Sequence, residues 1–96
     1  MATAYIRVGG AMGGGAPVYS AKPRWTEDLD AATVATTTQT AQAGDYLRIV
    51  ASGGAIRVAI SANPTASATS GDIVLDGQAV DFGPLAQGDK VSVIDV

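Results

Sequence analysis

The clearest pattern of hydrophobic and polar positions lies in residues 54–65. Apolar side chains recur there at every second position, at Ile56, Val58 and Ile60, and small or charged residues occupy the positions between them. Such alternation predicts a half-buried β-strand. Asn63-Pro64 follows, and proline both lacks a backbone N–H for sheet pairing and disfavours helix in the residue before it. We therefore predict that this strand ends in a turn at residues 63–64.

Two β-hairpins are predicted around this strand. In residues 45–61, an alternating segment leads through a glycine-containing turn into the central strand. In residues 73–82, Asp76-Gly77 separates two further segments with strand-like composition. The inward-facing side chains of the last of these segments are expected to be Val80 and Phe82.

Three other segments have strand patterns. Residues 5–8 alternate weakly, with Ile6 and Val8 expected to point inward. Residues 32–43 are rich in threonine and alanine, and because neither face is strongly apolar they predict an exposed or edge strand. Residues 90–94 are predicted to close the chain as a strand, with Val91 and Val93 buried.

A glycine-aspartate pair precedes three of the predicted strands, at residues 44–45, 71–72 and 88–89. Glycine readily adopts the left-handed conformation that turns need, and aspartate bonds to nearby backbone, so these pairs indicate turns rather than catalytic aspartates. The chain thus contains six to eight short strands at fairly even spacing and no long helical pattern. This predicts an all-β fold, either an antiparallel β-sandwich or a jelly-roll-like barrel.

The first thirty residues have a different composition from the rest. Five glycines fall within residues 9–15, and glycine loses the most backbone freedom on folding, which favours a tether or wide loop. Residues 17–25 have a proline near each end and favour an extended chain. Residues 26–30 are expected to form a turn or helical start. We therefore predict an extended N-terminal arm over residues 1–30 and a β-sandwich domain over residues 31–96.

Arms on small domains commonly reach a neighbouring molecule, so the arm holds the candidate functional residues. The partner-binding candidates are its aromatic and cationic side chains: Tyr5, Arg7, Tyr19, Arg24 and Trp25. Trp25, the single tryptophan, is expected to be a packing residue of the rim or core, with carbohydrate stacking as the alternative. The acidic residues of the arm suit a helix N-terminus, with a divalent-cation site as the alternative. These acidic residues are Glu27, Asp28 and Asp30.

Composition predicts a single domain with a thin core. The chain has 96 residues, and 47% of them are hydrophobic, but many of these are alanine. A domain of this size buries only about 60–65% of the surface that its unfolded chain exposes. Without disulfides or a metal, association with further copies is a common way to stabilise such a chain, so we expect a homo-oligomer, either a dimer or a trimer.

Charge and missing residue types exclude several functions. The net charge of −3 and the six scattered Lys and Arg residues argue against a nucleic-acid binder. No apolar run approaches the ~20 residues that span a bilayer, and no secretory leader pattern opens the chain. Histidine and cysteine are both absent, which removes the usual catalytic base and the commonest metal ligands. We therefore expect no enzymatic activity, cofactor or metal, no membrane contact, and synthesis in the cytoplasm.

From about residue 42 to the end, the chain resembles small structural proteins of tailed bacteriophages. Three segments carry the resemblance: residues 46–50, residues 58–66 with their Asn-Pro stop, and residues 88–94. The family resemblance implies a β-sandwich virion module that decorates capsids or forms head fibres and spikes. It covers just over half of the chain and includes no functional residues to transfer.

The resemblance and the thin core together favour a capsid decoration (cement) protein. Such a module would lie on the capsid exterior of the virion after synthesis in the host cytoplasm, would bind the major capsid protein, and would stabilise contacts between capsid subunits. The alternative is a head-fibre, spike or tail-associated module that recognises a host surface glycan. Its stacking platforms would be Trp25, Tyr19 or Tyr46.

Overall fold

The computed structural model describes residues 2–10 and 23–96, and within them the chain forms eight β-strands and no helix. In chain order the strands are β1 (Thr3–Gly9), β2 (Trp25–Asp30), β3 (Ala35–Thr36), β4 (Tyr46–Ser52), β5 (Ile56–Ser61), β6 (Asp72–Val74), β7 (Ala79–Phe82) and β8 (Lys90–Asp95). Two four-stranded sheets result, with strand orders β2-β1-β4-β7 and β3-β8-β5-β6. All pairings between these strands are antiparallel. The predicted all-β sandwich is confirmed.

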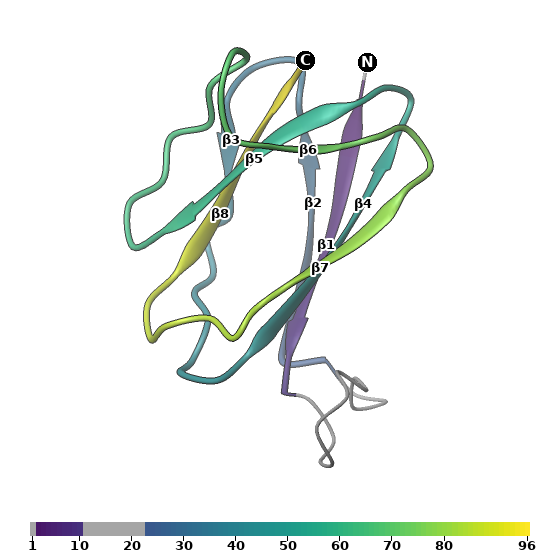
Figure 1. Cartoon of the computed structure of the whole chain (residues 1–96). Coiled ribbons are helices and arrows are strands. Elements are labelled where there is room, and N and C mark those ends of the chain that lie inside the picture. Colours follow the sequence, from purple (N-terminus) through teal and green to yellow (C-terminus); the bar gives the residue numbers. More distant parts are fainter. Residues whose placement is uncertain (1, 11–22) are drawn as a thin grey trace.

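The two sheets pack against each other, with the core between them (Figure 1). β1 and β4 are the inner strands of one sheet, and β8 and β5 are the inner strands of the other. These four strands supply most of the large buried side chains: Ile6, Val8, Leu47, Ile49, Ile56, Val58, Val91 and Val93. Alternation therefore identified the core correctly, because every second residue of a half-buried strand faces the opposite sheet.

The central strand and the last strand form as predicted. β5 ends at Ser61, two residues before Asn63 of the Asn-Pro stop. Val91 and Val93 of β8 are buried. Gly44, Gly71 and Gly88, the glycines of the three Gly-Asp pairs, adopt φ values of 85°, 96° and 87°. These values lie in the left-handed region that glycine adopts most easily. The interpretation as turns is confirmed at Gly44 and Gly88, whereas Gly71 forms a bend directly before β6.

Both predicted hairpins are wrong. β4 and β5 follow each other in sequence but lie in different sheets, as do β6 and β7. The connection through Gly53 and Gly54 therefore crosses from one layer of the sandwich to the other. β4 pairs instead with β1 and β7, and β5 pairs with β8 and with β6, the next strand along the chain. The physical reason is that alternation determines which face of a strand is buried and does not determine its neighbour.

The predicted N-terminal arm over residues 1–30 is also wrong for the part that the structure describes. β1 is an inner strand, paired on both sides with β2 and β4. Ala4, Ile6 and Val8 are at most 2% exposed. The first residues are thus part of the core and the domain begins before residue 31. The glycine-rich stretch from residue 11 and the following residues up to 22 lie outside the described residues.

Two local predictions between residues 26 and 43 had different outcomes. Residues 26–30 form β2 instead of a turn or helical start, because Trp25 and Leu29 are buried and β2 pairs with β1 over six residues. Tertiary pairing here overrides the local acidic pattern. Within residues 32–43, β3 is only two residues long, and it lies at the edge of its sheet as predicted.

Candidate functional site

The outer face of the β2-β1-β4-β7 sheet brings candidate residues together. Since Ile6 of β1 points into the core, its neighbours Tyr5 and Arg7 point outward. The sheet register places Tyr5 opposite Asp28 on β2 and opposite Val50 on β4. The two outward residues of β1 therefore acquire neighbours from strands about 20 and 40 residues further along the chain.

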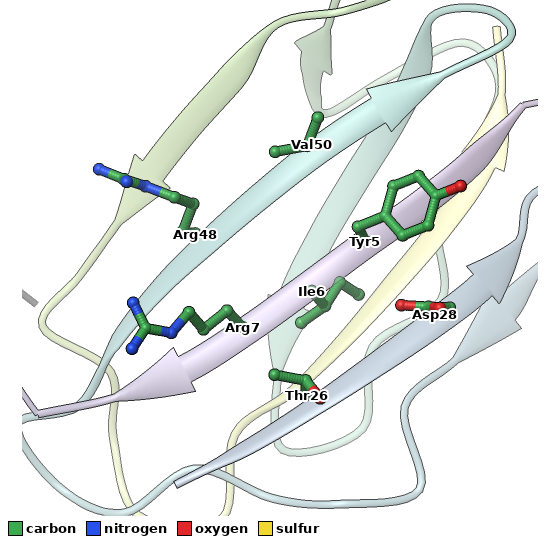
Figure 2. Close-up of a pocket in the computed structure, with 7 residues that line it drawn as sticks. All are labelled: Tyr5, Ile6, Arg7, Thr26, Asp28, Arg48 and Val50. Atoms are coloured by element: carbon green, nitrogen blue, oxygen red, sulfur yellow. The ribbon is translucent and has the colours of Figure 1, made fainter. Parts of the chain in front are cut away.

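These side chains line a shallow hollow of about 260 Å³. Its lining residues come from three adjacent strands and are Tyr5, Ile6, Arg7, Thr26, Asp28, Arg48 and Val50. Figure 2 shows that the Arg7 and Arg48 side chains extend toward the same end, whereas the Tyr5 ring extends toward the other end, near Asp28. The hollow therefore has a basic end and an acidic end with an exposed aromatic ring beside it.

The basic end is built from an unusual pairing. Arg7 and Arg48 lie directly opposite each other on antiparallel neighbours, and like charges at opposed positions are unfavourable. Arg48 is oriented by Asp81 of β7, which accepts hydrogen bonds of 2.8 Å from Nε and 3.1 Å from Nη2. Because this ion pair is largely exposed, it contributes little stability and acts chiefly by orienting the guanidinium group.

Arg24, another sequence candidate, is not in the hollow. It lies one residue before β2, and its Nε and Nη2 atoms donate hydrogen bonds of 2.7 and 2.9 Å to the two carboxylate oxygens of Asp45. The hydrogen bonds from Arg24 hold the pKa of the Asp45 carboxyl below its usual range, and the carboxylate in turn raises the pKa of Arg24. Asp45 is buried. This pair therefore joins the start of β2 to the loop before β4.

Trp25 is a packing residue, as the sequence analysis expected. It is 8% exposed and belongs to the core cluster. Its indole Nε1 donates a hydrogen bond of 2.8 Å to the backbone oxygen of Thr40, which satisfies the one polar atom of the ring. The alternative of carbohydrate stacking by Trp25 is wrong because the ring is enclosed. Tyr19, the remaining candidate, lies outside the described residues.

The acidic residues of the first thirty positions do not gather into a cation site. Successive residues of a strand point to opposite faces, so Glu27 is separated from Asp28 and Asp30. Glu27 instead accepts hydrogen bonds from the backbone N–H of Thr38, at 3.1 Å to each carboxylate oxygen. Within residues 2–10 and 23–96, no group of three or more such side chains could hold a metal ion.

The opposite outer face, on the β3-β8-β5-β6 sheet, has a different chemistry. Ile73 of β6 and Ile94 of β8 are both register partners of Arg57 on β5. Apolar side chains also occur where the strands of this sheet begin or end. Together they form what we call the apolar end: Val34, Ile73, Leu75, Ile94 and Val96. Four of these five are among the five large hydrophobic residues that the described part of the chain exposes.

Arg57 lies among these apolar side chains with part of its guanidinium group unsatisfied. Its Nη1 donates a hydrogen bond of 2.9 Å to the backbone oxygen of Gly71, whereas its buried Nε has no hydrogen-bond partner. Further along the same face, the loop at residues 62–70 covers Ser92, whose Oγ accepts a 3.0 Å hydrogen bond from the backbone N–H of Ala66. Only one end of this face is therefore apolar and exposed.

Sequence reasoning found Tyr5 and Arg7 but missed their neighbours in the hollow. Arg48, Asp28 and Val50 become neighbours only through the register of β1 with β2 and β4. Their outward positions follow from alternation within each strand, but the sequence has no local signal that pairs the strands. Comparison with known proteins identifies no relative of this chain: no protein-family model, curated protein or solved structure matches it. Among the described residues, no helix is long and apolar enough to cross a membrane.

Proposed function

We propose that this chain is a non-enzymatic virion module of a tailed bacteriophage that decorates the capsid and stabilises contacts between capsid subunits. The observation that supports this function best is the presence of two outward faces of different chemistry on one small sandwich. One face carries the hollow, with its charges and its exposed Tyr5. The other carries the apolar end. A module with two unlike contact faces can bridge two neighbouring molecules.

The position of these faces supports bridging rather than binding to a single partner. The two sheets lie back to back around the core (Figure 1), so their outer faces point away from each other. Exposed apolar side chains that gather on one surface commonly mark a protein interface. The hollow is open and has charged side chains at its ends, which suits a weaker contact. Many copies on one capsid would strengthen such contacts through multivalency.

The glycan-binding alternative has less support. Of its three stacking platforms, Trp25 is buried, and Tyr46 is only partly exposed and contacts Gly83. Tyr19 lies outside the described residues. A glycan platform needs an aromatic ring with one open face beside hydrogen-bonding groups. Tyr5 is the described tyrosine that comes nearest to this arrangement, and it was not among the platforms expected from the sequence.

The proposal is tested with particles that lack the chain. Phage particles produced from a genome in which this gene is deleted should assemble, and should release DNA at a lower temperature than wild-type particles. Adding the purified chain should restore the release temperature, and Leu75→Asp should restore it less well because it places a charge in the apolar end. Identical release temperatures with and without the chain would contradict a stabilising role on the capsid.

A further inference from the structure

The guanidinium group of Arg57, at the apolar end, is incompletely paired. Its Nη1 donates a hydrogen bond to the backbone oxygen of Gly71, but its buried Nε has no hydrogen-bond partner. Arg24 and Arg48 each present the equivalent edge, Nε with Nη2, to both oxygens of an aspartate. In Arg57 this edge has no partner within the described residues, and its Nη2 atom is not buried. Because a buried donor without an acceptor is unfavourable, a ligand that supplies an acceptor is favoured at this edge.

The positions around Arg57 on the outer face of the sheet are apolar. Its register partners are Ile73 on β6 and Ile94 on β8. Its neighbours two residues away along the same strand are Ala55 and Ala59, which share its face because side chains alternate. The guanidinium group is therefore surrounded by aliphatic side chains on the surface of the sheet.

More exposed side chains extend this apolar surface in two directions. The β3-β8 register, continued by one residue, places Val34 beside Ile94. The backbone N–H of Val96 donates a hydrogen bond to the oxygen of Ala55, and the β5-β6 register, continued by one residue, places Leu75 on the other side of Ala55. Val34, Leu75 and Val96 are 44%, 58% and 61% exposed. The apolar end thus forms one surface with Arg57 inside it.

No carboxylate of the described chain pairs with Arg57. The closest acidic residues in the register, Asp72 and Asp95, alternate with the outward isoleucines of β6 and β8 and so belong to the opposite face. Asp95 accepts a hydrogen bond of 3.2 Å from the backbone N–H of Ala2. Neither aspartate forms an ion pair with Arg57. The apolar end therefore carries a positive charge that no group on its own face compensates.

From these features we propose that the apolar end binds an aliphatic segment of the capsid partner that carries a carboxylate, with the carboxylate paired to Arg57. Ile73 and Ile94 contact the aliphatic groups on either side of it. Guanidinium binds carboxylates through planar, paired hydrogen bonds, and apolar surroundings strengthen such a pair. The identity of the partner rests on the function proposed above. The chemistry of the ligand does not, because it follows from this surface alone.

The charge at this surface disfavours two other occupants. A second copy of the chain, packed on it by two-fold symmetry, would bring two Arg57 groups together, and like charges at an interface are unfavourable. The outward positions of β5 and β8 supply no acidic residue that could separate them: they are Arg57, Ala59, Ser61, Lys90, Ser92 and Ile94. A wholly aliphatic partner would remove the guanidinium group from water without giving it an acceptor.

The ligand chemistry is tested on the free protein by NMR, with cyclohexylacetate as the probe. Its titration into the ¹⁵N-labelled chain should shift the side-chain Nε–H signal of Arg57 and the backbone signals of Ile73 and Ile94 in a saturable manner. The dissociation constant should be on the order of millimolar, as expected for a single small contact. Neutral cyclohexylacetamide should bind at least fivefold more weakly, because it lacks the negative charge.

Variants then assign the binding to individual side chains. Arg57→Gln should weaken cyclohexylacetate binding at least fivefold and should remove the preference over the amide. Ile73→Ala, at an exposed position, should weaken the binding of acid and amide alike. The matched control is Lys90→Gln, which removes a positive charge from the far end of the same sheet face and should bind as wild type.

The outcomes separate this proposal from the proposed function. No saturable shift at Arg57, or equal affinity for acid and amide, overturns the carboxylate site whatever the particle experiments show. Dimerisation of the wild-type chain that Ile73→Asp abolishes overturns the capsid segment as occupant and assigns the surface to a second copy. On particles, Arg57→Gln should lower the occupancy of the chain whereas Lys90→Gln should not. Equal occupancy of these two variants, together with cyclohexylacetate binding, overturns the capsid partner while the ligand chemistry stands.

Discussion

The guanidinium group of Arg24 binds the buried carboxylate of Asp45 through two hydrogen bonds, of 2.7 and 2.9 Å. Asp45 also accepts a hydrogen bond of 3.1 Å from the backbone N–H of Gln42 and is only 2% exposed. The backbone oxygen of the same residue accepts a hydrogen bond from the N–H of Leu85. Asp45 thus connects three segments at one end of the sandwich, although its sequence context indicated only a turn.

Acid should destabilise the protein through Asp45. Its pKa is lowered in the folded state, so the folded protein binds fewer protons than the unfolded chain and stability falls as pH decreases. The stabilisation is fully present above the unfolded pKa of about 3.9 and is lost as pH falls through the lower folded pKa. Asp45→Asn should reduce the free energy of unfolding by about 1–3 kcal/mol at pH 7, because a charged hydrogen-bond acceptor is lost.

Denaturant unfolding of both proteins at pH 7 and pH 3 checks this prediction. The difference between wild type and Asp45→Asn should shrink at pH 3. Asp81→Asn is the matched control, since it breaks the exposed ion pair with Arg48 and should cost at most about 1 kcal/mol. An equal difference at the two pH values would show that the charge of Asp45 does not stabilise the fold.

Gly83 should not tolerate a side chain. A Cβ atom at this position would lie 2.6 Å from Cδ1 of Tyr46, and the glycine has a φ of 150°. Gly83→Ala should therefore destabilise the protein by about 1–3 kcal/mol through overpacking, in addition to the backbone cost. Gly77→Ala is the control, because its φ is also positive but its Cβ would meet no atom within 4 Å.

A double-mutant cycle with Tyr46→Ala isolates the steric part of this effect. Removing the ring should make Gly83→Ala less costly by at least about 1 kcal/mol, because contacting residues couple in this way. Thermal or denaturant unfolding of the four proteins gives the coupling energy. Strictly additive costs would mean that the ring does not restrict position 83.

Trp25 should behave as a core residue. Trp25→Ala should lower the free energy of unfolding by about 3–5 kcal/mol, the usual cost of truncating a buried aromatic side chain. Tyr5→Ala is the control and should change stability by less than about 0.5 kcal/mol, as expected for an exposed position. Tryptophan fluorescence of the wild-type chain should be blue-shifted and poorly quenched by iodide. Emission typical of solvated tryptophan would contradict the enclosed ring.

Ile49 and Ile56 show most clearly what the sequence pattern can and cannot predict about the fold. Both are buried, as alternation indicated, but they belong to different sheets. Alternation in each strand gives the buried face, whereas the partner strand is chosen by long-range packing that no local pattern encodes. This is also why the β1 strand was recognised and its place in the sheet was not. The glycine run after it suggested separation from the domain.

The contrast between a predictable buried face and an unpredictable partner strand also explains which residues of the candidate site could be found from the sequence. Tyr5 and Arg7 were identified by residue type, and their outward positions follow from the buried Ile6 between them. Arg48 could be identified only from the register that places it opposite Arg7. Arg24 and Trp25 were selected on the same grounds as Tyr5, but they have structural roles because their partners, Asp45 and Thr40, come from a distant loop.

The most direct test of the proposed function is quantitative mass spectrometry of purified virus particles, with peptides of this chain compared against those of the major capsid protein. A decoration protein that contacts capsid subunits throughout the shell should be present at hundreds of copies per particle. A few to a few tens of copies would instead indicate a spike or tail position. Absence of the chain from purified particles would contradict the account of it as a virion module.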